Sequence, residues 1–132
     1  MLGAGAVGMA VAETLAAREA SVRVVSRSVL REPVAGVQSV AGDVTDPTFA
    51  ASATHGARVV YQALNPPYHR WAQEFPSLQA AAIAAAQTAG ARLVVMDNVY
   101  MYGRANGRPF TEERHHDAHT RNAASARRWP AT

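Results

Sequence analysis

Three glycines near the amino terminus, Gly3, Gly5 and Gly8, have the spacing G-x-G-x-x-G. In a strand-turn-helix unit the first glycine permits a tight turn, the second lets backbone approach a ligand, and the third lets the helix pack on the sheet. The free N–H groups and positive dipole end of such a helix attract phosphate. The motif predicts a phosphate-binding turn formed by Gly3, Gly5, Ala6, Val7 and Gly8, against the simpler interpretation of a glycine-rich turn without a ligand.

The residues about 20 positions after such a motif select between the two nicotinamide dinucleotides, because an acidic residue there binds the ribose 2′-hydroxyl of NAD. This chain has Ser26, Arg27 and Ser28 in that region instead. Arginine pairs with a 2′-phosphate, and flanking hydroxyls can donate hydrogen bonds to it. We therefore predict NADP as the favoured cofactor, with NAD possible, held by Arg27 and Ser28. The alternative is that Arg27 is a solvated surface charge.

Two further loops follow predicted strands and are expected beside the cofactor. Asp43 and Val44 come after the third strand, where Asp43 could accept a hydrogen bond from the adenine amino group or equally satisfy its own turn. Ala63, Leu64 and Asn65 come after the fourth strand. Ligands of parallel sheets bind at the carboxyl ends of the strands. Both loops are therefore predicted to line the cofactor site.

Short runs rich in β-branched residues alternate with alanine-rich stretches along the chain. The runs SVRVVS, VQSVAGD, ARVVYQAL and ARLVVMDN fit strands that are buried on both faces of a parallel sheet. Helices are expected over about residues 6–18, 47–54 and 71–89. Strands alternating with helices at this spacing indicate right-handed βαβ crossovers. The predicted fold class is α/β, a Rossmann-type doubly wound parallel sheet of about five strands.

The helices carry their own signals. In the first helix an apolar face is expected from residues that recur four apart: Val7, Val11 and Leu15. In the third, Pro76 should kink or restart the helix and Gly90 should end it. Trp71 and Phe75, also four apart, are predicted to be packing residues rather than a ligand cage.

Composition narrows the function classes. The 132 residues suit one domain over 1–132, and 48% of them are hydrophobic. No cysteine is present, which excludes disulfides, zinc–thiolate sites and thiol catalysis. The formal net charge is +3, and all 13 basic residues are arginines spread along the chain, so a nucleic-acid partner is not predicted. No apolar run approaches the roughly 20 residues needed to span a bilayer, so a membrane partner is not predicted either. The amino terminus lacks the basic stretch of a signal peptide, and a cytoplasmic protein is expected.

Both ends of the chain look cut. A central strand is typically five or six residues long, but Met1 and Leu2 alone precede the glycine turn. We expect a chain truncated at both ends, without a substrate domain. The alternative is a first strand that is naturally short.

Four local features together resemble a known family. GAGAVG, GDVTD, ALNPPY and DNVYMYG, within about residues 2–103, are similar to the amino-terminal portion of an atypical extended short-chain dehydrogenase/reductase of the NAD-dependent epimerase/dehydratase type. The resemblance implies a cofactor-binding domain followed by a smaller substrate domain. It also implies hydride transfer between a nicotinamide and a small carbonyl or hydroxyl substrate.

The chain departs from that family at the catalytic residues. The family uses a tyrosine that transfers a proton and a lysine four residues later, but this chain has no lysine, and the corresponding region, DAHTRNAA, has no tyrosine. Asn98 stands where the family has Ser or Thr, and Arg121 could stabilise an anion but not donate a proton. Tyr100 and Tyr102 are predicted to be structural. No catalytic residue is assigned.

The function predicted is the NAD(P)(H)-binding domain of an oxidoreductase or a sugar-epimerase/dehydratase-like enzyme. Alternatives are a non-catalytic NADP-sensing regulator and a non-functional gene fragment. A cluster of polar residues comes late in the chain: His115, His116, Asp117 and His119. His115 and His119 could share a helix face, but no HExxH pattern accompanies them and the segment is typical of a loop, so no metal site is predicted.

Overall fold

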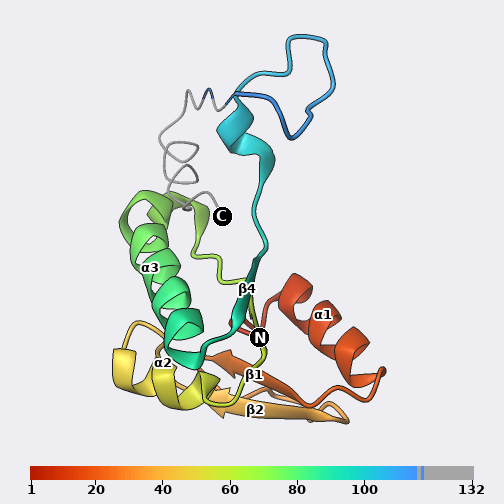
Figure 1. Cartoon of the computed structure of the whole chain (residues 1–132), viewed down its shortest axis with the longest axis vertical. Coiled ribbons are helices and arrows are strands. Elements are labelled where there is room, and N and C mark those ends of the chain that lie inside the picture. The colour runs from red at the N-terminus through yellow and green to blue at the C-terminus, as the bar shows by residue number, and fades with distance from the viewer. Residues whose placement is uncertain (116, 118–132) are drawn as a thin grey trace. The chain divides into compact units, whose positions relative to one another are not determined.

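The computed structural model describes residues 1–115 and 117 (Figure 1). Its elements are α1 (Ala6–Ala16), β1 (Val22–Ser26), β2 (Val37–Ala41), α2 (Pro47–Thr54), β3 (Val59–Gln62), the 3-10 turn η1 (Tyr68–Arg70), α3 (Trp71–Ala89), β4 (Arg92–Val95) and the 3-10 turn η2 (Val99–Tyr102). The chain divides into a first unit, Met1–Asn65 with Ser77–Met96, and a second unit, Pro66–Pro76 with Asp97–Thr132. Each unit is described by itself below.

The strands of the first unit are parallel, as the sequence predicts. β1 pairs with β2 and β3 pairs with β4. Leu2 joins the two pairs, because it forms parallel bridges to Val25 of β1 and to Gln62 of β3. The order across the sheet is therefore β2, β1, Leu2, β3 and β4, so the residue just ahead of the glycine turn occupies the central position.

Helices cover both faces of this sheet, which confirms the doubly wound α/β architecture (Figure 1). One hydrophobic cluster contains Ala12 of α1 with Val22 and Val24 of β1. The other contains Val60 of β3 with Ala53 of α2 and Ala82 of α3. Three residues of β1 are buried, as predicted for a strand covered on both faces, but none of β2 or β4 is fully buried, so the prediction fails for these two outer strands.

The predicted apolar face of α1 is partly wrong. Gly8 and Ala12 are the buried residues of this helix, whereas Val7 is 44% exposed. The helix lies close to the sheet on small residues, and this rotation turns Val7 to the surface at the first turn. The valine therefore stands at the predicted phosphate site rather than in the core.

The other helices begin and end where the sequence signals place them. The Asp46 carboxylate accepts hydrogen bonds from the backbone N–H groups of Thr48 and Phe49, so it caps α2. Gly90 has a φ of 61° after the end of α3, as a left-handed terminator requires. Pro76 does not restart α3, which is one helix over its 19 residues. In the part of the chain that the structure describes, no helix is both long and apolar enough to cross a bilayer.

Gln79 of α3 is buried without a hydrogen-bond partner: its side chain is 3% exposed, and neither amide atom has a partner among the described residues. An unpaired buried amide costs about 1–3 kcal/mol. We expect Gln79→Leu to raise the free energy of unfolding by about 1 kcal/mol in urea titrations. Gln87→Leu, on the exposed face of the same helix, is the control and should change it by less than about 0.5 kcal/mol. A loss of stability in Gln79→Leu would contradict this expectation.

Candidate functional site

The glycine turn lies at the carboxyl ends of the two central strands. The Gly3 N–H donates to the Val25 carbonyl oxygen at 2.9 Å, and the Ala63 N–H donates to the Leu2 carbonyl oxygen at 2.8 Å. Gly3 has a φ of 106°, and a Cβ there would lie 2.8 Å from the Ala63 carbonyl oxygen. A Cβ on Gly8 would overlap the Gly3 carbonyl oxygen. The first and third glycines are therefore required by the packing of the turn itself.

Gly5 differs from its two neighbours in the motif. It has a φ of −74°, which any residue can adopt, and a Cβ there would meet nothing within 4 Å. Gly5 is the N-cap of α1 without a side-chain cap, and Ala6 and Val7 that follow are exposed. The first N–H groups of a helix have no intrahelical partner. Open space over free N–H groups at a positive helix end fits a phosphate.

The end of β1 carries the predicted cofactor-selecting residues. Arg27 and Ser28 are both exposed, and the Ser26 hydroxyl donates to the Ser28 carbonyl oxygen at 2.5 Å. The Gly42 N–H donates to the Ser26 carbonyl oxygen at 2.9 Å, which places the end of β2 directly beside this segment. Arg27 is thus an accessible cation at the edge of the sheet where the glycine turn lies.

Asp43 forms the local turn that was one of its two predicted roles. Its carboxylate accepts from the Thr45 N–H at 2.9 Å and from the Thr45 hydroxyl at 2.7 Å. These hydrogen bonds, with a smaller effect of the nearby Arg27 guanidinium, lower the pKa of Asp43. Thr45 was not among the predicted site residues, although an Asp followed two positions later by Thr is a recognisable turn signal. Val44 is 5% exposed in the core, so its backbone alone is available to a ligand.

The loop after β3 lies next to the glycine turn through the contact between Gly3 and Ala63. Leu64 packs against the core and its carbonyl oxygen accepts from the buried Gln62 amide at 3.1 Å, whereas Asn65 is exposed. Within the first unit, the structure therefore brings the glycine turn and the three predicted loops to one edge of the sheet.

The second unit holds the residues that follow β4. The Asn98 side chain accepts from the Tyr100 N–H at 2.9 Å and so begins η2. Trp71 and Phe75 are buried and stacked, with ring centroids 5.0 Å apart, which confirms their predicted packing role. The Tyr100 ring lies 6.1 Å from that of Trp71. The amide of Asn98 is thus committed to its own turn.

The polar cluster near the end of the chain is described only at His115 and Asp117. His116 and His119, like Arg121, lie outside the described residues. Among the residues that are described, no group of three or more His, Cys, Asp or Glu could hold a metal ion.

A cavity of about 760 Å³ in the first unit lies away from the predicted site. Its lining includes Ser21, Val22, Arg58 and Val59, at the amino ends of β1 and β3, and none of the predicted cofactor residues. The two sites are therefore at opposite ends of the strands.

Comparison with known families decides the assignment. The sequence model of the NAD(P)H-binding family matches residues 3–129. The chain belongs to the NAD(P)H-binding family. The match begins at Gly3, the first glycine of the turn, and the parallel α/β sheet described above is the fold that such a domain needs. Comparison with curated proteins gave no match.

Solved structures share the fold of this NAD(P)H-binding chain. A putative exported protein from Burkholderia pseudomallei is 28% identical with a TM-score of 0.68, over 96% of this chain and 60% of that one. The Bordetella bronchiseptica enzyme WbmG, solved with NAD and UDP, is 21% identical with a TM-score of 0.77, over 95% and 45%. A UDP-glucose-4-epimerase from Stenotrophomonas maltophila, solved with NAD, is 19% identical with a TM-score of 0.76, over 95% and 44%. The chain thus spans 44–60% of the length of these three proteins.

Proposed function

We propose that this NAD(P)H-binding domain serves an oxidoreductase or sugar-epimerase/dehydratase-like enzyme and that it favours NADP. The observation that carries the proposal is the open space over Gly5 at the uncapped start of α1. Nothing in the packing of the turn requires glycine at this position, whereas a bound pyrophosphate would, because backbone must approach it closely. The epimerase and WbmG structures, both solved with NAD, support the enzyme class.

Each part of the site has a role toward the dinucleotide. The turn from Gly3 to Gly8 would hold the pyrophosphate on backbone N–H groups, and Arg27 with Ser28 would hold the 2′-phosphate. Backbone of the loops at 43–44 and 63–65 would line the adenosine and the path toward the nicotinamide. When bound, the cofactor supplies hydride transfer to or from a small carbonyl or hydroxyl substrate. The chain itself supplies binding, orientation and charge.

The preference for NADP rests on the charges at the end of β1. Arg27 is exposed and would pair with a 2′-phosphate. The Asp43 carboxylate is close enough to Arg27 to respond to its charge, and alone it would repel a phosphate. Arg27 therefore offsets the charge of Asp43 and would leave the end of β1 favourable to an anion.

Titration of the full chain with NADPH and NADH, followed by fluorescence or calorimetry, tests this. We expect saturable binding that favours NADPH, and Arg27→Asp should weaken NADPH binding at least tenfold, about 1.4 kcal/mol, with NADH binding kept. Arg18→Asp makes the same charge change at an exposed position after α1 and should leave the preference intact. A folded chain that binds neither dinucleotide would overturn the proposal. An equal loss of NADPH affinity in both variants would indicate a general effect of charge and no specific role for Arg27.

A non-catalytic redox sensor is the second candidate, and the absence of any lysine favours it. The family's tyrosine needs that lysine to lower its pKa from about 10 toward the working pH. A sensor predicts NADPH binding without turnover of a panel of carbonyl substrates. Turnover would favour the enzyme and require a different proton donor.

A further inference from the structure

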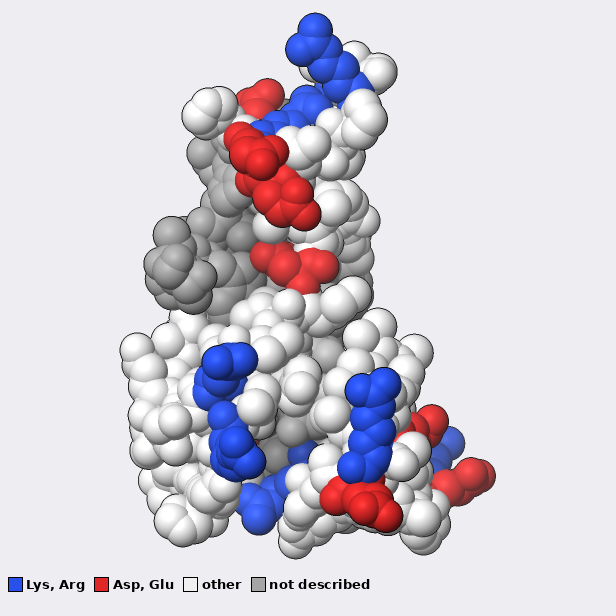
Figure 2. Space-filling view, turned by 45° about the vertical axis from the view of Figure 1, so that its right-hand side comes forward, with Lys and Arg blue, Asp and Glu red and all other residues white. Residues whose placement is uncertain are grey.

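The core of the first unit contains polar side chains. On the face that Figure 2 shows, charged side chains stand at the surface, whereas the buried polar side chains among the described residues are uncharged: Thr54, Gln62 and Gln79. The Thr54 hydroxyl has the carbonyl oxygens of Ala50 and Ala85 at 2.8 and 3.3 Å. Each glutamine, by contrast, has a buried side-chain atom without a partner. A native core rarely contains such atoms, so the side chains that carry them are candidates for a role beyond packing.

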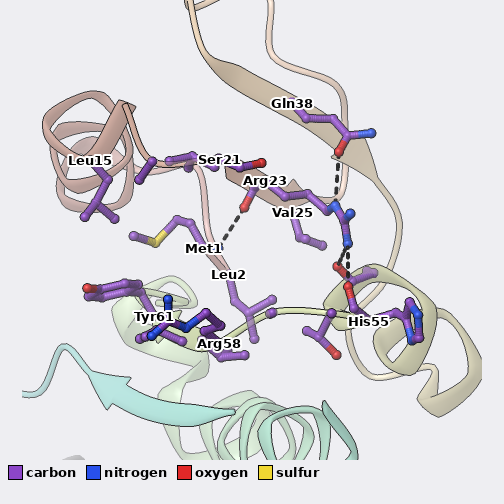
Figure 3. Close-up of a pocket in the computed structure, with 18 of the residues that line it drawn as sticks. Met1, Leu2, Leu15, Ser21, Arg23, Val25, Gln38, His55, Arg58 and Tyr61 are labelled. Carbon is purple, nitrogen blue, oxygen red and sulfur yellow. Dashed lines mark hydrogen bonds between the residues drawn. The ribbon is translucent and has the colours of Figure 1, made fainter. Parts of the chain in front are cut away.

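Gln62 is the last residue of β3, directly before the loop of the candidate site, and its side chain is 1% exposed. Side chains alternate along a strand, so Gln62 shares the face of Val60. Val60 belongs to the hydrophobic cluster that includes residues of α2 and α3, whereas Tyr61, which Figure 3 labels, takes the other face. A strand residue in such surroundings is ordinarily apolar. The amide is therefore an exception at the point where the strand ends and the site begins.

Half of the Gln62 amide is used and half is not. The Nε2 atom donates to the Leu64 carbonyl oxygen at 3.1 Å, and the Oε1 atom is buried without a partner. Donor and acceptor are two residues apart, so this hydrogen bond ties the first residues of the loop back to the end of the strand. The Leu64 side chain packs against the same cluster as Val60, which holds the loop from the other side.

The loop that Gln62 holds is in backbone contact with the glycine turn. The Ala63 N–H donates to the Leu2 carbonyl oxygen at 2.8 Å. A Cβ on Gly3 would lie 2.8 Å from the Ala63 carbonyl oxygen and 3.1 Å from the Leu64 nitrogen. No side chain separates the two segments, so a displacement of Ala63 or Leu64 would be passed directly to Gly3.

We propose that Gln62 is a positioning residue of the dinucleotide site, because its amide donor holds the 63–65 loop where the loop closes against Gly3. This role rests on the proposed function, in which the glycine turn binds the dinucleotide. An apolar side chain of similar length would fill the same space without an unpaired oxygen, but it would leave the Leu64 carbonyl oxygen without its donor. The donor is therefore the part of Gln62 that the site uses.

Gln62→Met in the full chain tests this role, because methionine is also unbranched and apolar and lacks the donor. We expect NADPH binding to weaken by about fivefold or more, which corresponds to the loss of one hydrogen bond. The thermal midpoint should stay within about 3 °C of the wild type, since the variant loses the hydrogen bond and the unpaired oxygen together. Gln62→Leu serves in its place if Gln62→Met does not fold.

Gln79→Leu is the matched control, because it removes the other buried amide of the first unit, neither atom of which has a partner among the described residues. Its affinity for NADPH should stay within about twofold of the wild type although its stability rises. An equal loss of affinity in the Gln62 and Gln79 variants would show an effect of the core as a whole and would overturn the proposal. Unchanged affinity in the Gln62 variant would overturn it as well.

Hydrogen exchange without ligand measures the loop itself. In Gln62→Met the Ala63 amide should exchange about tenfold faster or more, because the loop opens locally. The Met96 amide, which donates to the Gln62 carbonyl oxygen at 2.8 Å, should be unchanged and so report an intact strand pair. Unchanged exchange at Ala63 would show that Gln62 does not hold the loop. A folded wild type that binds no dinucleotide would overturn the proposed function, whereas exchange at Ala63 would still decide whether Gln62 holds the loop.

Discussion

A Gly5→Val chain is expected to fold like the wild type and to lose dinucleotide affinity by at least tenfold, about 1.4 kcal/mol. The new side chain would enter space that no other residue occupies, at a φ of −74° that valine adopts readily. It would therefore cost the fold little beyond a weaker helix cap, up to about 1 kcal/mol. It would fill the space over the first N–H groups of α1, where phosphate is expected. Thermal unfolding and NADPH titration of the same preparation measure the two effects.

Ala10→Val is the matched control, because it also places a valine in α1, at an exposed position away from the start of the helix. Its affinity for NADPH should stay within about twofold, a difference near 0.4 kcal/mol. Unchanged affinity in Gly5→Val would contradict the phosphate assignment of the turn. A collapse of both stability and affinity would mean instead that Gly5 is a packing residue.

The Gly8→Ala substitution is expected to destabilise the fold rather than to weaken dinucleotide binding selectively. The added Cβ would overlap the Gly3 carbonyl oxygen, which is backbone and cannot turn aside. Either the helix or the turn must move, and overpacking of this kind costs about 1–3 kcal/mol or more. We expect the free energy of unfolding to fall by about 3 kcal/mol in urea titrations.

Gly5→Ala supplies the control for this stability effect, since it adds the same atom two residues from Gly3 in open space. It should change the free energy of unfolding by less than about 1 kcal/mol. A Gly8→Ala chain as stable as Gly5→Ala would show that the helix can shift at no cost. The packing around Gly8 would then not require glycine, although a Cβ there overlaps backbone and one at Gly5 meets nothing.

Much of the fold could be predicted from the sequence because its signals are local. The bounds of α2 and α3 follow from an Asp46 cap and a Gly90 terminator, and the four strands follow from short β-branched runs. The face of α1 was less predictable. A four-residue repeat of valine and leucine indicated one buried face. The helix instead buries the face that contains Gly8 and Ala12, because small residues let it approach the sheet closely.

The meeting of the candidate loops was predictable, whereas the surroundings of their side chains were not. Strand ends in a parallel sheet must meet at one edge, so the glycine turn and the loops at 27–28, 43–44 and 63–65 were expected together. The Val44 side chain is buried by tertiary packing, and the Thr45 hydroxyl donates to the Asp43 carboxylate because of the local turn geometry. Residue types at a strand end specify neither of these.

The proposed pyrophosphate contacts of the glycine turn are backbone N–H groups, and this affects how such a domain can change over evolutionary time. A ligand held by main-chain N–H groups places few demands on side chains, so sequences can drift while the binding surface keeps its shape. Structures only 19–28% identical to this chain share its fold. Selectivity, under the function proposed above, would instead depend on exposed side chains such as Arg27, outside the buried core. A lineage could therefore exchange one dinucleotide for the other through one or two surface substitutions, without rebuilding the sheet that carries them.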